Sequence, residues 1–306
     1  MMITAILDFG TNTFNLLIAE RQERGFKILL SSKQPVKLGR GGIQVNRITA
    51  DAMERGYVAI QNHMEVIRNY EVDEIRAFAT SAIRNAENGE AFTEEVRRRF
   101  GFRTRIIPGE REAELIYKGV RQAVAFGEEN ALILDIVGGS IEFIICNKHG
   151  IVWKRSFELG MARLLEIFSL SDPISSEEVR VLENHFRQEL APLREVVKKE
   201  KPLTLIGASG SFDTFHALIR HRKGMESDPY FGREISLKDY ARLHKTLVRS
   251  TREERLAMPG MEPVRVEMIV AATIFVSFVL RDCQISHLYH SEFALKEGVI
   301  SELVGI

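Results

Sequence analysis

Two stretches of this sequence share one pattern, and this internal repeat constrains the fold more than any other feature. Residues 131–147 read ALILDIVGGSIEFIICN, in which an apolar run ends in Asp135, breaks at a glycine pair and then resumes. The pattern is typical of a buried strand, a tight turn and a returning strand. Residues 5–20 read AILDFGTNTFNLLIAE, and their alignment with residues 132–147 places Asp8 on Asp135. The repeat predicts two related domains whose turns face each other and clamp one ligand.

The turn residues carry the chemistry of this pattern. The alignment also matches three further pairs of positions: Gly10 with Val137, Thr13 with Ser140 and Asn15 with Glu142. Gly138 and Gly139 remove side chains where backbone N–H groups can close on an anion. Asp135 and Glu142 flank the same turn, and their carboxylates suit a divalent cation. The pattern therefore predicts a site for phosphate and magnesium.

The overall composition limits the class of protein. At 306 residues the chain is long enough for two domains with separate cores. Lysine plus arginine and aspartate plus glutamate both number 42, so the zero net charge gives no general attraction to nucleic acid or to a membrane. The two cysteines, Cys146 and Cys283, form no disulfide framework and suit a reducing compartment. Any anion-binding site must therefore be local.

The chain shows no targeting or membrane-spanning pattern. Its first residues run directly into a strand pattern, without the basic region, apolar core and cleavage site of a signal peptide. The longest apolar stretch, residues 268–280, is interrupted by Thr273 and Ser277 and is too short to span a bilayer. We therefore expect a cytoplasmic enzyme that binds neither nucleic acid nor membranes.

Strand and helix patterns alternate along the chain, which predicts an α/β fold. Besides the central hairpin, strands are expected at residues 3–8, 15–20, 26–32, 74–79, 104–107, 151–158, 203–206 and 285–289. Helices are expected at residues 49–69, 92–100, 110–126, 161–168, 175–199, 236–249, 264–281 and 293–303, with another starting near Phe212. Capping boxes are predicted at Ser175 with Glu178 and at Thr251 with Glu254.

Two segments of the sequence are predicted to be loops. Residues 34–46 contain glycines and the cations Lys37 and Arg40, with Arg47 just beyond. This composition fits both a solvated surface loop and a loop that approaches phosphate. Residues 223–235 read KGMESDPYFGREI and are expected to form a polar, mobile loop.

Three further segments hold candidate site residues. Residues 80–86, which include Arg84, follow a predicted strand at its carboxyl end, where α/β sheets usually place ligands. Glu112 lies in the first turn of a predicted helix, close to the positive end of the helix dipole, although composition alone favours an ordinary first-turn acid. Residues 207–211, GASGS, join a strand to a helix start and form a second kind of anion cradle.

Motifs of several other enzyme classes are absent from the sequence. There is no GxxxxGK[ST] phosphate loop, no HExxH pair and no paired CxxC. The GASGS segment does not match GxSxG because Ser211 occupies the position of the last glycine. Ser209 is therefore not expected to be an esterase-like nucleophile.

Seven ordered blocks of the sequence resemble the Ppx/GppA family. They are DFGTNTFNLLI from Asp8, ATSAIRNAENGEAF from Ala79, GEREAELIYKGV from Gly109, LDIVGGSIEF from Leu134, GASGSFD from Gly207, GMEPVRVEMIVAA from Gly260 and HSEFALKEGV from His290. The family comprises exopolyphosphatases and guanosine pentaphosphate phosphohydrolases of the acetate kinase, sugar kinase, Hsp70 and actin superfamily. Each block is weak alone, but their order along nearly the whole chain makes the resemblance specific.

The resemblance implies an α/β fold of two actin-like (ribonuclease H-like) domains with the active-site cleft between them. Domain I is expected at residues 1–125 and domain II at residues 126–291, with the final helix in residues 292–306 packing back on domain I. The resemblance also implies magnesium-dependent hydrolysis of a terminal phosphoanhydride in inorganic polyphosphate or guanosine pentaphosphate. Mn²⁺ is an alternative cation, and a homodimer is one possible oligomeric state.

The expected site gives these residues named roles. Glu112 matches the family's proposed catalytic base and is expected to orient and deprotonate the attacking water, while Arg84 offsets the growing negative charge. The cation is expected to bind Asp8, Asp135 and Glu142. Phosphate is expected to contact the two hairpin turns and the third cradle: Gly10, Thr11, Asn12, Thr13, Gly138, Gly139, Ser140, Ser209 and Gly210.

Two positions depart from the family's second turn, which usually reads DIGGGSTE. Val137 replaces a glycine and disfavours positive φ, and Ile141 replaces a threonine whose hydroxyl would reach phosphate or a metal-bound water. Such changes can weaken binding, change the substrate or abolish catalysis, but the retained Gly138, Gly139, Ser140, Asp135 and Glu142 favour an active enzyme. Two alternative functions stay open. The two departures leave room for a nonenzymatic sensor of polyphosphate or alarmone, and the turns shared with the kinases of the superfamily leave room for a phosphotransferase.

Overall fold

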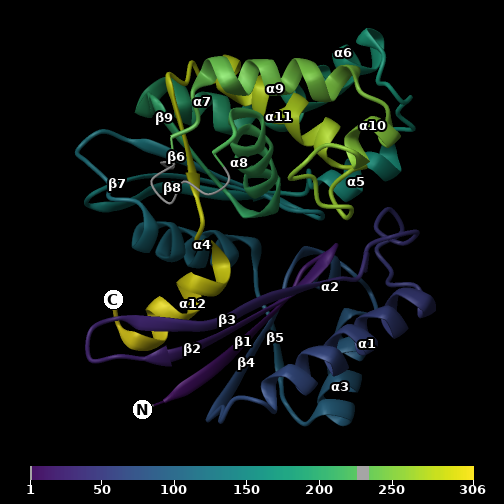
Figure 1. Ribbon diagram of the computed structural model, residues 1–306, viewed down its shortest axis with the longest axis vertical. Helices are drawn as coiled ribbons and strands as arrows, with labels where there is room; N and C mark the ends of the chain where they lie inside the picture. Colours follow the sequence, from purple (N-terminus) through teal and green to yellow (C-terminus); the bar gives the residue numbers. More distant parts are fainter. Residues whose placement is uncertain (1, 226–233) are drawn as a thin grey trace.

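The computed structural model of the protein describes residues 2–225 and 234–306. Its strands form two five-stranded sheets, which lie in separate lobes with two helices between them (Figure 1). The first sheet has the order β3-β2-β1-β4-β5, with β1 (Ile3–Phe9), β2 (Thr13–Arg21), β3 (Phe26–Pro35), β4 (Glu74–Ala79) and β5 (Thr104–Ile106). The second has the order β10-β9-β6-β7-β8, with β6 (Ala131–Ile136), β7 (Ile141–Asn147), β8 (Gly150–Phe157), β9 (Thr204–Ala208) and β10 (His287–Ser291).

The two sheets share one topology, as the sequence repeat predicts. β1 pairs antiparallel with β2 and parallel with β4, and β6 pairs antiparallel with β7 and parallel with β9. The pairing places Asp8 opposite Asn15 in the first hairpin and Asp135 opposite Glu142 in the second. The alignment of the hairpins is thus confirmed in the strand register, and the α/β fold class is confirmed with it.

Strand alternation directs both aspartates toward the space between the lobes. In β1, Phe9 joins the outer core of the first lobe, whereas Ile6 joins a core shared by both sheets. Successive side chains point to opposite faces of a sheet, so Asp8 lies on the face of Ile6. In β6, Asp135 lies in the same way on the face of Ile133, which also belongs to the shared core.

Two helices fill the space between the sheets (Figure 1). α4 (Gly109–Ala123) and α12 (Leu295–Val304) pack against each other, and α12 also contacts β1 and β2. Their backbones approach so closely that a Cβ atom at Gly298 would lie 1.7 Å from the carbonyl oxygen of Leu115. The last helix therefore reaches the first lobe through a crossing that only glycine permits.

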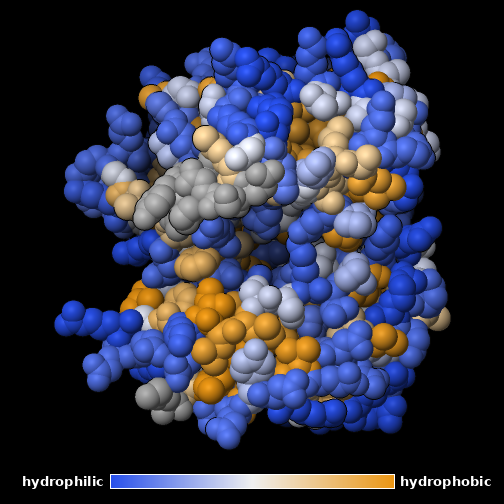
Figure 2. Space-filling model, viewed as in Figure 1, coloured by the Kyte–Doolittle hydropathy of each residue, from blue (hydrophilic) through white to orange (hydrophobic). Residues whose placement is uncertain are grey.

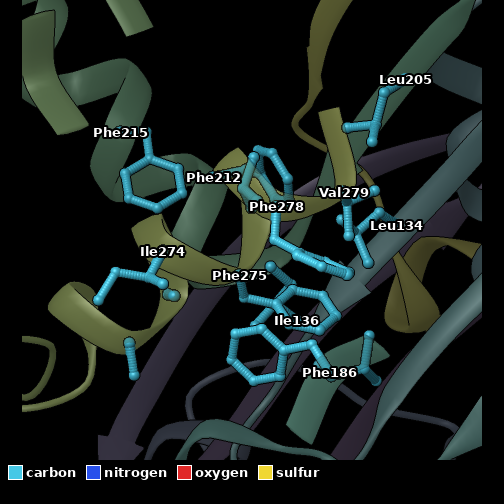
Figure 3. Packing of buried hydrophobic residues seen from close by; sticks show 14 of the residues in the cluster. Leu134, Ile136, Phe186, Leu205, Phe212, Phe215, Ile274, Phe275, Phe278 and Val279 are labelled. Atoms are coloured by element: carbon cyan, nitrogen blue, oxygen red, sulfur yellow. The ribbon is translucent and has the colours of Figure 1, made fainter. Parts of the chain in front are cut away.

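Each remaining helix belongs to one lobe. In the first lobe they are α1 (Ala50–Ile67), α2 (Ser81–Arg84) and α3 (Gly89–Phe100). In the second they are α5 (Met161–Ile167), α6 (Ser176–Glu189), α7 (Ala191–Glu200), α8 (Ser209–Lys223), α9 (Leu237–Arg249), α10 (Arg252–Leu256) and α11 (Ile269–Asp282). Figure 3 shows aromatic rings of α6, α8 and α11 packed against β6, where the ring centroids of Phe186 and Phe275 lie 4.9 Å apart. This packing supports the second sheet on the side away from the shared core.

One predicted helix is wrong. Residues 175–199 form two helices, α6 and α7, because the chain leaves helical geometry at Leu190. Pro192 follows in the first turn of α7, where a proline is tolerated, but it cannot continue α6 because it lacks a backbone N–H and its ring clashes with the preceding turn. The capping box predicted at Ser175 with Glu178 is confirmed.

Two other helix starts differ from the prediction. α11 begins at Ile269 rather than at residue 264, and α8 begins at Ser209 rather than near Phe212. Most of the loop predicted at residues 223–235 lies outside the described residues.

Hydrophilic residues cover most of the face in Figure 2, with an apolar patch on the first lobe. Across residues 2–225 and 234–306, no helix combines the length and the apolar composition needed to cross a bilayer.

Gly298→Ala tests the close crossing of α12 and α4. In an exposed helix, replacing glycine by alanine usually stabilises by up to about 1 kcal/mol. Here the added methyl group would meet the Leu115 carbonyl oxygen, so we expect the free energy of unfolding in urea to fall by about 1–3 kcal/mol. Gly127→Ala is the matched control, because a Cβ there meets no atom within 4 Å. Equal stability of the two variants would contradict this packing.

Candidate active site

A cavity of about 300 Å³ lies where the two hairpin turns and the middle helices meet. Most of the predicted site residues line it: Asp8, Gly10, Thr11, Asn12, Thr13, Glu112, Asp135, Gly138, Ser209 and Gly210. Four other predicted residues do not: Arg84, Gly139, Ser140 and Glu142. The structure thus brings together two turns, a helix start and a third cradle that lie far apart in the sequence.

The two turns pack directly against each other, and this contact requires glycine in the second turn. A Cβ atom at Gly138 would lie 2.4 Å from Nδ2 of Asn12, and one at Gly139 would lie 2.3 Å from Oγ1 of Thr11. Neither glycine has a positive φ, so the requirement is for space and not for backbone freedom.

Three backbone N–H groups at the turns are available to a ligand. The N–H of Gly10 donates to the carbonyl oxygen of Thr13 at 3.1 Å and closes the first turn, so it is not available to a ligand. The N–H groups of Thr11, Asn12 and Gly138 donate to no protein group in the described structure, and all three residues line the cavity. Unused N–H groups at such turns suit the binding of an anion.

Glu112 is buried beside these turns, in the first turn of α4, with 3% of its surface exposed. Burial raises the pKa of its carboxyl to about 8, against the opposing effect of Arg84, and the charges of Asp8 and Asp135 raise it further. A carboxyl whose pKa lies near neutral pH suits a general base.

Arg84 lies behind Glu112 and not on the cavity wall. Its Nη1 donates to Oε2 of Glu112 at 2.9 Å and to the carbonyl oxygen of Ile107 at 3.1 Å. Its Nη2 donates to Oε1 of Glu158 at 3.3 Å. The guanidinium is thus shared between two glutamates, and its position suits fixing the orientation of Glu112.

Three more carboxyl groups lie near Glu112. Each accepts a hydrogen bond from a neutral side chain: Asp8 from Asn15 (2.9 Å), Asp135 from Ser209 (2.8 Å) and Glu142 from Ser156 (2.7 Å). Burial raises the pKa of all three, to about 7 for Asp135, and neighbouring carboxylates add to the effect. None of the three forms a salt bridge in the described structure, so the protein itself does not compensate their charge when they ionise.

The chemistry of these carboxylates fits a divalent cation. Oδ1 of Asp135 and Oε2 of Glu142 are buried without a hydrogen-bond partner in the described structure. Mg²⁺ prefers such oxygen atoms, and it usually takes one or two carboxylates together with water and phosphate. Among the described residues no three Asp, Glu, His or Cys side chains cluster closely enough to hold a metal ion. The predicted set of Asp8, Asp135 and Glu142 is thus not a complete cage, and a cation there would need substrate oxygens.

Several charged residues of the cavity were not predicted from the sequence. They are Lys33, Asp213, Arg265, Glu292, Lys296 and Glu297. Arg265 packs closely against Gly210: a Cβ atom at Gly210 would lie 1.8 Å from Nη2 of Arg265. Burial lowers the pKa of the Arg265 guanidinium. The sequence signal that could have identified Arg265 is the block from Gly260, in which this arginine lies shortly before an apolar helix.

The cationic segment at residues 34–46 bridges the lobes. Lys37 pairs with Glu267 at 3.2 Å, and the N–H of Gly41 donates to Glu166 at 2.7 Å. No residue of this segment lines the cavity. Val36, Leu38 and Ile43 are buried as well, so the segment is not the solvated surface loop of the first interpretation, and the phosphate-approach interpretation gains no support because the segment does not reach the cavity.

Comparison with known proteins identifies the family to which the chain belongs. The model of the Ppx/GppA phosphatase family matches residues 17–305. The chain belongs to the Ppx/GppA phosphatase family. It is 28% identical over 314 residues to Exopolyphosphatase 2 of Mycobacterium tuberculosis, and the match covers 98% of each chain.

Solved structures of Ppx/GppA proteins share the fold. An exopolyphosphatase from Cytophaga hutchinsonii matches with a TM-score of 0.96 and 36% identity, over 99% of this chain and 98% of that one. A family member from Aquifex aeolicus matches with a TM-score of 0.80 and 26% identity, over 99% of this chain and 98% of that one. The two five-stranded sheets are the two actin-like domains of this family.

The structure accommodates both departures from the usual Ppx/GppA turn. Val137 is not among the residues with positive φ, so a branched side chain fits there without backbone strain. Ile141 is fully buried in the outer core of the second lobe, because side chains alternate along β7 and Glu142 points the other way. A hydroxyl at position 141 would face this core and not phosphate. The physical reasons for expecting weaker binding were therefore wrong.

Glu112→Gln should change how the stability of the ligand-free protein depends on pH. The pKa of Glu112 is raised above its unfolded value, so folding favours the protonated carboxyl and stability is lost as pH rises toward about 8. Calorimetry should show the melting temperature of the parent falling between about pH 6 and about pH 8, and that of Glu112→Gln falling less. Glu110→Gln, at an exposed position of the same helix turn, should behave like the parent. An equally steep fall in all three proteins would contradict the raised pKa.

Ile141→Thr restores the residue that the family usually has, but it should not improve the site. We expect no gain in phosphate release, and a loss of about 2–4 kcal/mol in the free energy of unfolding, because the change removes buried apolar groups and buries a hydroxyl. Ile141→Val, which removes one carbon and adds no polar atom, should cost only about 1 kcal/mol. Faster phosphate release at unchanged stability in Ile141→Thr would show that position 141 faces the ligand.

Proposed function

We propose that the protein hydrolyses the terminal phosphoanhydride of inorganic polyphosphate and releases orthophosphate, with Mg²⁺ as its cation. The observation that carries this proposal is the buried carboxyl of Glu112 beside two turns whose residues line one cavity and have unused N–H groups. Its relatives from M. tuberculosis and C. hutchinsonii are named exopolyphosphatases, which supports the same substrate class.

The substrate would be held by turns from both domains. The N–H groups of Thr11, Asn12 and Gly138 donate to oxygens of the terminal phosphate, and the half-buried Arg265 faces the same cavity from the side of Gly210. These donors are positioned before the substrate arrives, so they stabilise the charge that develops in the transition state without reorganisation.

Glu112 would act as the general base. It accepts a proton from a water molecule that attacks the terminal phosphorus in line with the leaving chain. The new P–O bond forms as the anhydride P–O bond breaks. The shortened chain departs with the bridging oxygen. Arg84 holds the carboxylate from behind through its hydrogen bond of 2.9 Å. Because burial raises the pKa of Glu112 to about 8 in the ligand-free protein, the ionised fraction of the base increases as pH rises through that value.

Asp135 and Asp8 would hold Mg²⁺, or Mn²⁺ in its place, with Glu142 beside them. When bound, the cation supplies positive charge that polarises phosphate oxygens and offsets the buried carboxylates. The unpartnered oxygens of Asp135 and Glu142 support this assignment.

Guanosine pentaphosphate is the alternative substrate, since it presents the same terminal phosphoanhydride to Glu112. Phosphate release from tripolyphosphate, long-chain polyphosphate and guanosine pentaphosphate, each with Mg²⁺, with Mn²⁺ and without metal, separates these substrates and tests the cation. The division into domain I (1–125) and domain II (126–291), a cytoplasmic location and a homodimer are further parts of this proposal.

Glu112→Gln should lower kcat for phosphate release by about 10²–10⁴ with little change in KM, because the base acts on the attacking water and not on substrate binding. Glu110→Gln is the matched control, since it removes an exposed carboxylate from the same turn of α4 and should retain the parental rate. Steady-state assays with tripolyphosphate and Mg²⁺ measure both. A folded Glu112→Gln protein with the parental kcat would refute this role.

A further inference from the structure

Ser209 has an unusual backbone conformation at the edge of the cavity. Its φ is 66°, in the left-handed region that residues other than glycine rarely adopt. It connects β9 to α8 and lines the cavity. The other described non-glycine residues with positive φ lie away from the cavity: Lys37, Asn46, Lys201 and Gln284. Glycine would adopt this conformation without strain, so a serine here is best explained by a contact that its side chain makes.

The Ser209 hydroxyl makes such a contact with Asp135. Its Oγ donates to Oδ2 of Asp135 at 2.8 Å. The second carboxylate oxygen, Oδ1, is buried and has no hydrogen-bond partner in the described structure. Asp135 is only 2% exposed, so protein contacts and not solvent set the orientation of its carboxylate.

We propose that Ser209 is a positioning residue for the cation: its hydroxyl fixes Oδ2 of Asp135 and leaves Oδ1 available to coordinate the ion. This role rests on the cation-dependent hydrolysis proposed above, and it differs from the phosphate contact predicted for Ser209 from the sequence. Hydrogen bonds that orient a metal ligand typically change metal affinity 10–100-fold. Ser209 lies where β9 ends and α8 begins. The neighbouring strand β6 ends beside it, because Ala208 of β9 pairs with Asp135 of β6.

Ser209→Ala and Ser209→Gly separate the hydroxyl from the backbone conformation. Both remove the bond to Asp135, but only glycine relieves the strain, so Ser209→Gly should melt at a higher temperature than Ser209→Ala. Electron paramagnetic resonance of free Mn²⁺ during a titration with orthophosphate present should show that both variants bind Mn²⁺ about 10–100-fold more weakly than the parent. Ser209→Thr keeps a hydroxyl and should retain most of the affinity. Ser211→Ala, buried in the same helix but not lining the cavity, should bind Mn²⁺ like the parent.

The outcomes separate this role from the proposed function. Parental Mn²⁺ affinity in folded Ser209→Ala and Ser209→Gly would overturn the positioning role and leave the proposed hydrolysis intact. A second result would also overturn the positioning role: Mn²⁺ binding and melting temperature that fall equally in the Ser209 variants and in Ser211→Ala. This result would indicate a general disturbance of α8. A parent protein that binds no Mn²⁺ even with orthophosphate present would overturn the cation and the positioning role together, and phosphate release without metal by that protein would show that the hydrolysis itself survives.

Discussion

Four carboxyl groups lie near one another between the lobes, three of them on the wall of one cavity and Glu142 behind it, and the remainder of the site follows from this constraint. Among Asp8, Glu112, Asp135 and Glu142, Glu112 alone has a hydrogen-bonded cation in the described structure, namely Arg84. Removing charged groups from water is costly unless each is paired, and burial accordingly raises the pKa of all four. Such a cluster does not favour folding. The cation and the phosphate substrate proposed above would offset this buried charge, and the proposal thereby links the electrostatics to phosphoanhydride chemistry.

The fold produces this cluster by simple geometric rules applied twice. Each hairpin places an aspartate on the inner face of its sheet, because side chains alternate along a strand and the outer face is used for the core. α4 then carries Glu112 into the gap. The close contact of Gly138 and Gly139 with the first turn, and the glycine crossing of α12 with α4, set the spacing between the lobes. The packing that stabilises the two domains therefore also fixes the distances within the site.

The sequence predicted those parts of the site that depend on local pattern. Asp8 and Asp135 could be assigned because the two hairpins align. Glu112 could be assigned only through the resemblance to the Ppx/GppA family, because composition alone favours an ordinary first-turn acid. The partner of Glu112 could not be predicted, since the pairing with Arg84 joins segments that meet only in the folded protein. Arg265 was missed for the same reason. The errors at Val137 and Ile141 were avoidable in part: adjacent strand residues point to opposite faces, so Ile141 could not share the site face with Glu142.

The most direct test is a crystal structure of the Glu112→Gln protein with tripolyphosphate and Mn²⁺, with anomalous diffraction to locate the metal. The central claim is that turns from both domains grip one oligophosphate beside the Glu112 position. It predicts a terminal phosphate within hydrogen-bond distance of the N–H groups of Thr11, Asn12 and Gly138, and an anomalous peak next to Oδ1 of Asp135. Tripolyphosphate bound elsewhere on the protein, with neither phosphate nor manganese between the two turns, would contradict it.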